Sequence, residues 1–252
     1  MIKSKKLKKI KNIKHGFFNS IGGKSKNIYK SLNCGPSSKD IPTNVQENLK
    51  IVKNKIDNKA KDIFLLHQIH SSKFIFVDEK YNGKIKPKAD AIITNKRYLP
   101  IAVLTADCVP ILICDDKKKM IAAIHAGWKG AYKGIIQKVI KFMIKKGCSL
   151  KDITASIGPS ISVKNYEVKE NFRKKFIKRN KKNFKYFRIK DNKLYFNLIN
   201  YVHSVLSNNK IKNIDTLKID TFDIKNKFFS ARRALSLKQN DYGRNISIIM
   251  LN

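Results

Sequence analysis

The pattern of apolar and polar positions predicts a β-hairpin in the middle of the chain. Two apolar runs, at 109–114 and 120–124, flank a polar segment at 115–119. If the turn has two residues (116–117) or four (115–118), Cys108 and His125 lie directly opposite each other. Their Cβ atoms would then be about 4.5–5.5 Å apart on one face of the sheet. A turn with an odd number of residues would break this pairing.

The rest of the chain mixes predicted helices and strands without a strict strand–helix–strand alternation. Apolar residues near helical spacing predict helices over 42–56, 130–146, 165–179 and 198–206. Short apolar runs predict strands over 63–66, 73–77, 91–94, 153–157, 186–189, 193–196, 219–222 and 245–251. No repeat or long linker divides the sequence, so we expect one α+β domain over 15–252 after a basic N-terminal segment at 1–14.

The chain is strongly basic, with a net charge of +37, which alone would suggest nucleic-acid binding. This charge comes from 48 Lys and only 7 Arg, and the Lys residues are scattered through every segment. Lys, Asn and Ile share A/T-rich codons, so a biased genome accounts for their abundance, whereas nucleic-acid binders usually concentrate Arg. We expect no specific nucleic-acid partner and only weak, salt-sensitive binding to polyanions.

Cysteine usage and hydropathy predict a reducing compartment and no membrane contact. The four cysteines form no CxxC pair and no regular framework, so we expect no disulfide scaffold. The basic start of the chain is not followed by the apolar core of a signal peptide. The longest apolar stretch, 101–114, is too short to span a bilayer and carries Asp107. We therefore expect a cytoplasmic protein.

Three residues, His70, Cys108 and His125, have the chemistry of a metal site. Two imidazoles and a thiolate suit zinc, and three protein ligands leave a fourth position for water or substrate, as in catalytic zinc sites. A thiol beside an imidazole could instead act without metal, as nucleophile and base in a Cys–His hydrolase or amidase. The simplest alternative is a buried thiol and two histidines that serve only as polar partners.

Arginines are candidates for binding an anion, because they were retained in a chain that otherwise uses Lys. Arg232, Arg233 and Arg244 are three of the seven, and each could either hold phosphate or carboxylate through two bonds or form a structural ion pair. Asp107 precedes Cys108, so on a strand it would point to the opposite face. There it could orient a neighbouring group or bond the backbone.

Short motifs distributed nearly from end to end carry a family resemblance. The most specific pair is Thr105-Ala-Asp-Cys-Val-Pro110 followed, at this spacing, by His125-Ala-Gly-Trp128. Further matching segments are 15–18, 22–23, 31–35, 68–70, 89–91, 157–159, 166–168, 229–233 and 243–244. In these residues the chain resembles the YfiH-type laccase-domain family, whose members are variously called polyphenol oxidases and purine nucleoside phosphorylases.

The resemblance implies a single-domain, layered α/β/β/α sandwich with mixed sheets. It implies that His70, Cys108 and His125 bind zinc, with copper as the alternative metal, and serve catalysis. It implies phosphorolysis of adenosine, inosine and methylthioadenosine, with adenosine deamination as a side activity, by a monomer or small homo-oligomer. Purine nucleosides and phosphate would then be its partners. The residues expected to contact substrate are Asn33, Gln68, Asp107, Arg232 and Arg233.

Two features of the sequence bear on these expectations. Asn19-Ser20 stands where the family often has Thr-Arg before a Gly-Gly turn. If that Arg holds an anion, the task falls here to Arg232, Arg233 or a Lys. Copper-dependent phenol oxidation is also ascribed to the family, but the sequence offers no second His-rich cluster for a multicopper centre.

Overall fold

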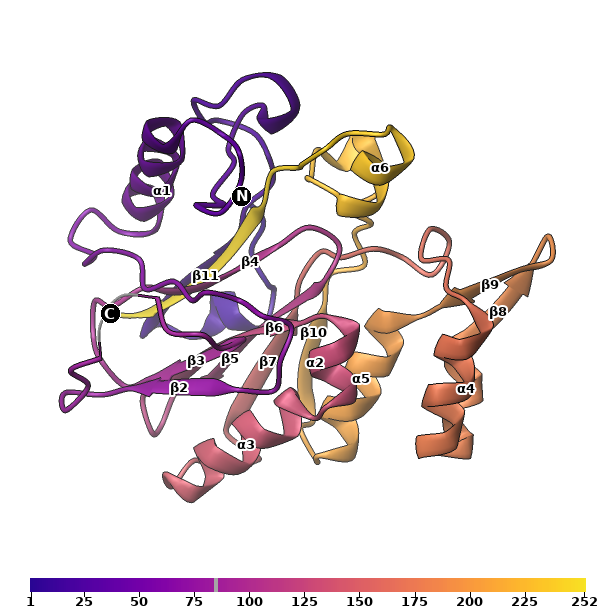
Figure 1. Cartoon of the computed structure of the whole chain (residues 1–252). Helices are drawn as coiled ribbons and strands as arrows, with labels where there is room; N and C mark the ends of the chain where they lie inside the picture. The colour runs from indigo at the N-terminus through magenta and orange to yellow at the C-terminus, as the bar shows by residue number, and fades with distance from the viewer. Residues whose placement is uncertain (84–85) are drawn as a thin grey trace.

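Two β-sheets stacked face to face form the centre of the molecule, and helices cover the outer face of each (Figure 1). The computed structural model describes residues 1–83 and 86–252. The four layers, helix, sheet, sheet and helix, are those of the expected α/β/β/α sandwich, and the α+β class is confirmed.

The larger sheet has six strands and mixed strand directions. Its order is β10 (Asn213–Thr216), β7 (Ile153–Ile157), β5 (Val109–Asp115), β6 (Met120–Ala126), β3 (Ala91–Thr94) and β2 (Phe74–Val77). The two outer pairs, β10 with β7 and β2 with β3, are parallel, and the inner pairs are antiparallel. Every residue of β5 and β6 is buried, because the central hairpin is covered on both faces. This explains why its strands are continuous apolar runs without alternation.

The smaller sheet is antiparallel, in the order β1 (Ile13–Phe17), β11 (Asn245–Leu251) and β4 (Ile101–Thr105). Its inner face packs on the larger sheet, where Val103 and Ile249 join Leu112 and Ile121 in one buried cluster. The ends of the chain meet in this sheet, because every residue of β1 pairs with β11. In the six-stranded sheet, by contrast, the central pair β5 and β6 is a hairpin of consecutive strands.

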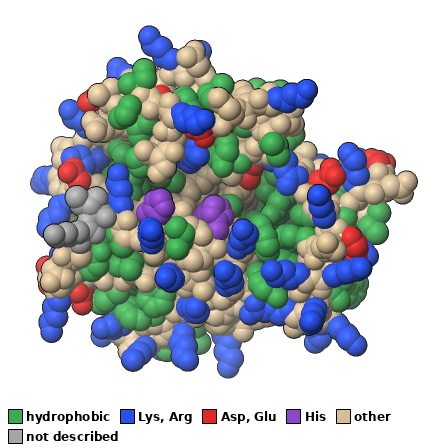
Figure 2. All heavy atoms as spheres, viewed as in Figure 1, with side chains coloured by type: hydrophobic (Ala, Val, Ile, Leu, Met, Phe, Trp, Pro, Cys, Tyr) green, Lys and Arg blue, Asp and Glu red, His purple; other side chains and the backbone are tan. Residues whose placement is uncertain are grey.

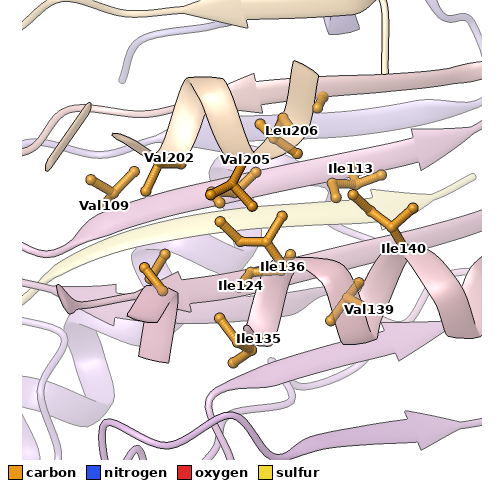
Figure 3. Packing of buried hydrophobic residues seen from close by; sticks show 14 of the residues in the cluster. Val109, Ile113, Ile124, Ile135, Ile136, Val139, Ile140, Val202, Val205 and Leu206 are labelled. Carbon is orange, nitrogen blue, oxygen red and sulfur yellow. The ribbon is translucent and has the colours of Figure 1, made fainter. Parts of the chain in front are cut away.

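The outer layers are helical. Helix α1 (Pro42–Ile56) covers the smaller sheet, with Val52 and Ile56 packed in a cluster that includes Ala102 and Ile248. Helices α2 (Trp128–Tyr132), α3 (Ile135–Lys145) and α5 (Leu198–Asn208) cover the larger sheet. Figure 3 shows the apolar side chains of α3 and α5 directed at those of β5 and β6. Completing the fold are α4 (Glu170–Arg179), the hairpin of β8 (Phe187–Lys190) and β9 (Lys193–Phe196), and α6 (Ala231–Ser236).

Most of the predicted elements occur where the sequence placed them, and the exceptions have local causes. Helix 42–56 and strands 91–94, 153–157 and 245–251 match the structure at both ends. The helix predicted over 130–146 is wrong in one respect: it is two helices, separated at Gly134, whose φ of 85° belongs to the left-handed region.

Two predicted strands, 63–66 and 219–222, are wrong, and three real strands, β1, β4 and β10, were missed. The first two segments form only isolated bridges, Phe64 with Ile101 and Ser160 with Asp220. In the structure β1 and β4 pair with β11, and β10 joins the larger sheet through a parallel pairing with β7. The short helix α6 was also missed.

The basic N-terminal segment packs against the rest of the chain. Leu7 is fully buried between the sheets, and Ile2 forms a bridge with Phe17. Ser4 is buried as well, with its hydroxyl donating to Asp215 at 2.6 Å. In the part of the chain that the structure describes, every helix is too short or too polar to cross a bilayer.

Candidate metal centre

Three side chains meet at one end of the larger sheet. The nitrogen and sulfur atoms that can bind a metal in His70, Cys108 and His125 all lie within 4.8 Å of one another. Cys108 Sγ is 3.9 Å from His70 Nε2, and the two imidazole rings meet edge to face with 4.7 Å between their centroids. His125 is buried, Cys108 half-buried and His70 exposed. The structure thus brings together the three residues that the sequence singled out.

The hairpin sets this geometry through a register that differs from the expected one. Asp115 pairs with Met120, so the four-residue turn begins one residue later than predicted, and His125 lies opposite Pro110. The prediction that Cys108 lies directly opposite His125 is therefore wrong by two residues. Cys108 lies in the bend directly before β5, and an even shift leaves the faces of the strand unchanged, so its sulfur still lies within 4.8 Å of the ligand nitrogens of His70 and His125.

A buried carboxylate, Asp90, holds both histidines. Its Oδ1 accepts a hydrogen bond from His125 Nδ1 at 2.8 Å and one from the His70 amide at 2.9 Å. Its Oδ2 accepts bonds from the Ser71 amide at 2.6 Å and from the Ser71 hydroxyl at 2.7 Å. These bonds hold His70 in a left-handed conformation, φ 54°, which is uncommon for a residue other than glycine. A carboxylate on Nδ1 also leaves His125 Nε2 free to bind a metal.

Charges within the cluster favour a thiolate next to a protonated imidazole. Burial opposes the thiolate, but the His125 and His70 imidazoles outweigh burial and lower the pKa of Cys108 to about 6. Burial likewise opposes the charged form of His125, whereas the Cys108 sulfur and the Asp90 carboxylate raise its pKa to about 9. The thiolate is both the metal ligand and the nucleophilic form of cysteine, so the site is prepared for either role.

The donor set and the space around it fit one zinc ion. Nitrogen and sulfur donors on one tetrahedral zinc lie roughly 3.3–3.7 Å apart, so atoms already within 4.8 Å reach it through small side-chain rotations. Gly127 provides the space: a Cβ there would be 2.9 Å from Cys108 Sγ and 3.1 Å from His70 Cδ2. Within residues 1–83 and 86–252, this is the one group of three or more His, Cys, Asp or Glu side chains close enough to share an ion.

A cavity of about 210 Å³ opens beside the cluster. Its lining consists of segments 35–37, 66–68 and 104–106 together with His70, Cys108, His125, Tyr242 and Arg244. Figure 2 shows a hollow at the centre of one face of the molecule, with two histidine side chains beside it. A larger cavity, of about 890 Å³, lies between segments 162–165, 197–200 and 218–224, and none of the three cluster residues lines it. The chemistry therefore favours the smaller cavity as the active site.

Two of the residues expected to contact substrate, Gln68 and Asn33, make hydrogen bonds within the protein. Gln68 lines the cavity, but its side-chain amide bonds the backbone N–H and C=O of Leu104 at 2.7 and 2.8 Å. Asn33 is fully buried and donates to Ser38 and Asp40, while its oxygen accepts from the amides of Gly35 and Arg244. In this structure both side chains position the cavity wall.

Asp107, Arg232 and Arg233 also make bonds to protein. Asp107 is buried outside a strand, with φ 84°, and accepts bonds from the Thr221 hydroxyl and the Arg232 amide. Burial raises its pKa, which those bonds partly offset. Arg232 donates to the Glu167 carbonyl. Arg233 donates to three carbonyls, those of residues 221, 222 and 228, and lines the larger cavity rather than the one beside the cluster.

Two residues of the site, Asp90 and Tyr242, had no role assigned from the sequence, and Arg244 was one of three arginines considered for binding an anion. Asp90 lies within the motif 89–91 and Arg244 within 243–244, so motif membership was the available signal. Asp90 reaches the cluster through its hydrogen bond to His125, which is more than thirty residues away in the sequence. Arg244 lines the cavity from the segment that follows β10. No spacing rule predicts either.

Three curated relatives share 32–37% of the aligned residues with this chain. A purine nucleoside phosphorylase of Rickettsia conorii is 37% identical over 190 residues, which are 75% of this chain and 77% of the relative. A purine nucleoside phosphorylase of Rickettsia prowazekii is 36% identical over 182 residues, 71% of this chain and 74% of the relative. One of Bacteroides thetaiotaomicron is 32% identical over 186 residues, 71% of this chain and 69% of the relative.

Solved structures share the fold over nearly the whole chain. The Bacillus licheniformis hypothetical protein YfiH superposes with a TM-score of 0.86 at 27% identity, covering 95% of this chain and 93% of that one. A Neisseria meningitidis protein of family DUF152 superposes with a TM-score of 0.83 at 29% identity, covering 96% and 95%.

The sequence profile of one family, described as multi-copper polyphenol oxidoreductase laccase, matches residues 14–252. This match and the relatives above confirm the resemblance that the motifs indicated. The chain therefore belongs to the multi-copper polyphenol oxidoreductase laccase family.

Proposed function

We propose that the protein is a purine nucleoside phosphorylase whose His70, Cys108 and His125 hold a catalytic zinc ion. The observation that carries this proposal is the cluster itself, with its donor atoms within 4.8 Å and His125 oriented by Asp90, in a chain whose relatives bear that name. The proposed substrates are phosphate with adenosine, inosine or methylthioadenosine. The products are the free base and a ribose 1-phosphate, or its methylthio derivative, with adenosine deamination as a side activity.

The chain's own residues account for how the site would be prepared. Asp90 accepts a hydrogen bond from His125 Nδ1 and so directs Nε2 toward the ion, while its bonds to residues 70 and 71 hold the second imidazole beside it. Gly127 leaves room for the ion. When bound, zinc would act as a Lewis acid at the position that three protein ligands leave open. Phosphate would attack the anomeric carbon of the nucleoside as the base departs.

Zinc is proposed over copper because two imidazoles and one thiolate suit it and need no second centre. The activity is proposed for the cytoplasm, where the four free cysteines stay reduced. We propose a monomer or small homo-oligomer.

The test is to purify the protein without added metal, measure bound zinc and copper, and incubate it with adenosine, inosine or methylthioadenosine and phosphate. We expect about one zinc per chain, and adenine or hypoxanthine together with a ribose 1-phosphate. Cys108→Ala should abolish turnover, and the control variant His203→Gln, at an exposed position on α5, should retain it. Full turnover by Cys108→Ala would refute the proposal, and inosine as the sole product from adenosine would change it to a deaminase.

A second candidate function is a metal-independent Cys–His hydrolase or amidase. The observation in its favour is the series Cys108, His125 and Asp90, in which a thiol of lowered pKa lies beside an imidazole bonded to a carboxylate. Chelation separates the two functions. Turnover that survives complete removal of metal, and is lost when Cys108 is alkylated, would favour the metal-independent enzyme.

A further inference from the structure

The cavity beside the metal cluster contains one permanent positive charge. Among its described lining residues, Arg244 is the one Arg or Lys, and none is Asp or Glu. The other polar side chains of the lining are those of the cluster and of Ser37, His67, Gln68, Thr105 and Tyr242. An anion that enters this cavity therefore finds its charge complement at Arg244.

Arg244 is held in place by a group outside the cavity. Its Nη1 donates to Asp241 Oδ1 at 2.8 Å and to the Tyr242 carbonyl, and the guanidinium lies 4.2 Å from the centroid of the Tyr242 ring. Burial opposes ionisation of Asp241, but the bonds it accepts from Lys39, Tyr29 and Arg244 lower its pKa to about 2. The guanidinium is therefore fixed by a carboxylate that stays charged at neutral pH.

The remaining donors of this guanidinium are available for a ligand. In the described part of the chain, Arg244 Nε and Nη2 make no hydrogen bond to protein. These two adjacent N–H groups form the edge with which Arg binds two oxygens of one oxyanion. Gly35 supplies room for the side chain, because a Cβ at that position would be 2.6 Å from Arg244 Cδ.

The two arginines that the family resemblance favoured for binding substrate, Arg232 and Arg233, lie outside the lining of this cavity. Arg233 donates to three backbone carbonyls and lines the larger cavity. Arg232 reaches the Glu167 carbonyl and lies 5.4 Å from the centroid of the Tyr166 ring. Neither belongs to the lining of the cavity that contains the cluster.

We propose that Arg244, stacked on Tyr242, is the oxyanion-binding residue of the active site and that its ligand is inorganic phosphate. This inference rests on the proposed phosphorylase function, and it identifies the group that binds the second substrate of that reaction. Arg244 Nε and Nη2 donate to two phosphate oxygens. The cluster of His70, Cys108 and His125 lies across the same small cavity.

The test measures phosphate binding directly, by isothermal titration calorimetry of the purified full-length protein with inorganic phosphate at physiological salt. Arg244→Gln removes the charge and the two adjacent N–H donors, whereas Arg244→Lys keeps the charge. Arg188→Gln is the control, because it makes the same charge change at an exposed position on β8. We expect Arg244→Gln to raise the Kd at least about tenfold and Arg244→Lys to raise it by less, with no change in Arg188→Gln. Thermal unfolding identifies any variant that fails to fold.

Kinetics separate this proposal from the proposed function. If the wild type catalyses phosphorolysis, Arg244→Lys should raise the KM for phosphate while leaving the KM for the nucleoside near its wild-type value. If the wild type shows no turnover, yet phosphate binds and Arg244→Gln abolishes the binding, the oxyanion site stands and the phosphorylase proposal fails. Equal binding by the wild type and Arg244→Gln, or no phosphate binding by the wild type, overturns the assignment of Arg244.

Discussion

The buried imidazole of His15 should make the stability of this fold fall in mild acid. His15 lies on β1 with 3% of its surface exposed, and its Nε2 accepts a hydrogen bond from the Ser4 amide at 3.0 Å. Protonation of Nε2 would place two N–H groups against each other. Burial, and to a smaller extent the nearby Lys3 charge, lower the pKa of His15 from 6.5 to about 4.

The sign and size of the effect follow from linkage. Because the folded pKa is below the unfolded one, the stabilisation from neutral His15 is fully present above pH 6.5 and is lost as the pH falls from 6.5 toward 4. At pH 5 the unfolded imidazole is mostly protonated and the folded one mostly neutral. The free energy of unfolding should therefore be lower by about 2 kcal/mol at pH 5 than at pH 7 from this group alone.

Urea unfolding of the wild type and of His15→Gln, each at pH 7 and pH 5, isolates this contribution. The amide oxygen of Gln can accept the Ser4 bond but does not titrate, so other groups that respond to pH contribute equally to both proteins. We expect the wild type to lose about 2 kcal/mol more than the variant between the two pH values. Losses that agree within about 0.5 kcal/mol would refute the argument that His15 must stay neutral.

Three further predictions concern the metal cluster. Asp90→Asn should weaken zinc binding about 10–100-fold in a chelator competition, because it perturbs the bonds that orient His125, and unchanged affinity would contradict that role. Gly127→Ala should lower the zinc content of the purified protein with a smaller effect on thermal unfolding, since its φ of −66° suits alanine but the added Cβ meets the cluster; full zinc loading would contradict the steric argument. In metal-free protein Cys108 should react first with a thiol reagent at pH 7, because its pKa is lowered whereas burial raises the pKa of Cys34 and Cys114. Bound zinc should protect Cys108 from the reagent. Mass spectrometry of the labelled peptides would show any other order of reaction.

The sequence alone determined much of the local structure and part of the site. Helix α1 and strands β3, β7 and β11 were predicted at their correct bounds, because the period of their apolar residues and the turns around them are local properties. The sequence also predicted that the side chains of Cys108 and His125 lie close together. The predicted register was wrong by two residues, yet both side chains share a face, because that depends only on whether the shift is even.

The tertiary structure decided the rest, because it depends on contacts between residues far apart in sequence. Strand β4 was missed, and its pairing with β11 joins residues far apart in the sequence. His70 reaches the cluster because Asp90, twenty residues later, binds its amide and holds a left-handed backbone. The sequence also could not predict which arginine faces the cluster, because Arg233 and Arg244 look equally suited to bind an anion. In the structure Arg233 donates to backbone carbonyls, whereas Arg244 lines the cavity. Residue types and their periodicity are encoded locally, whereas the convergence of loops at a site is set by packing of the whole chain.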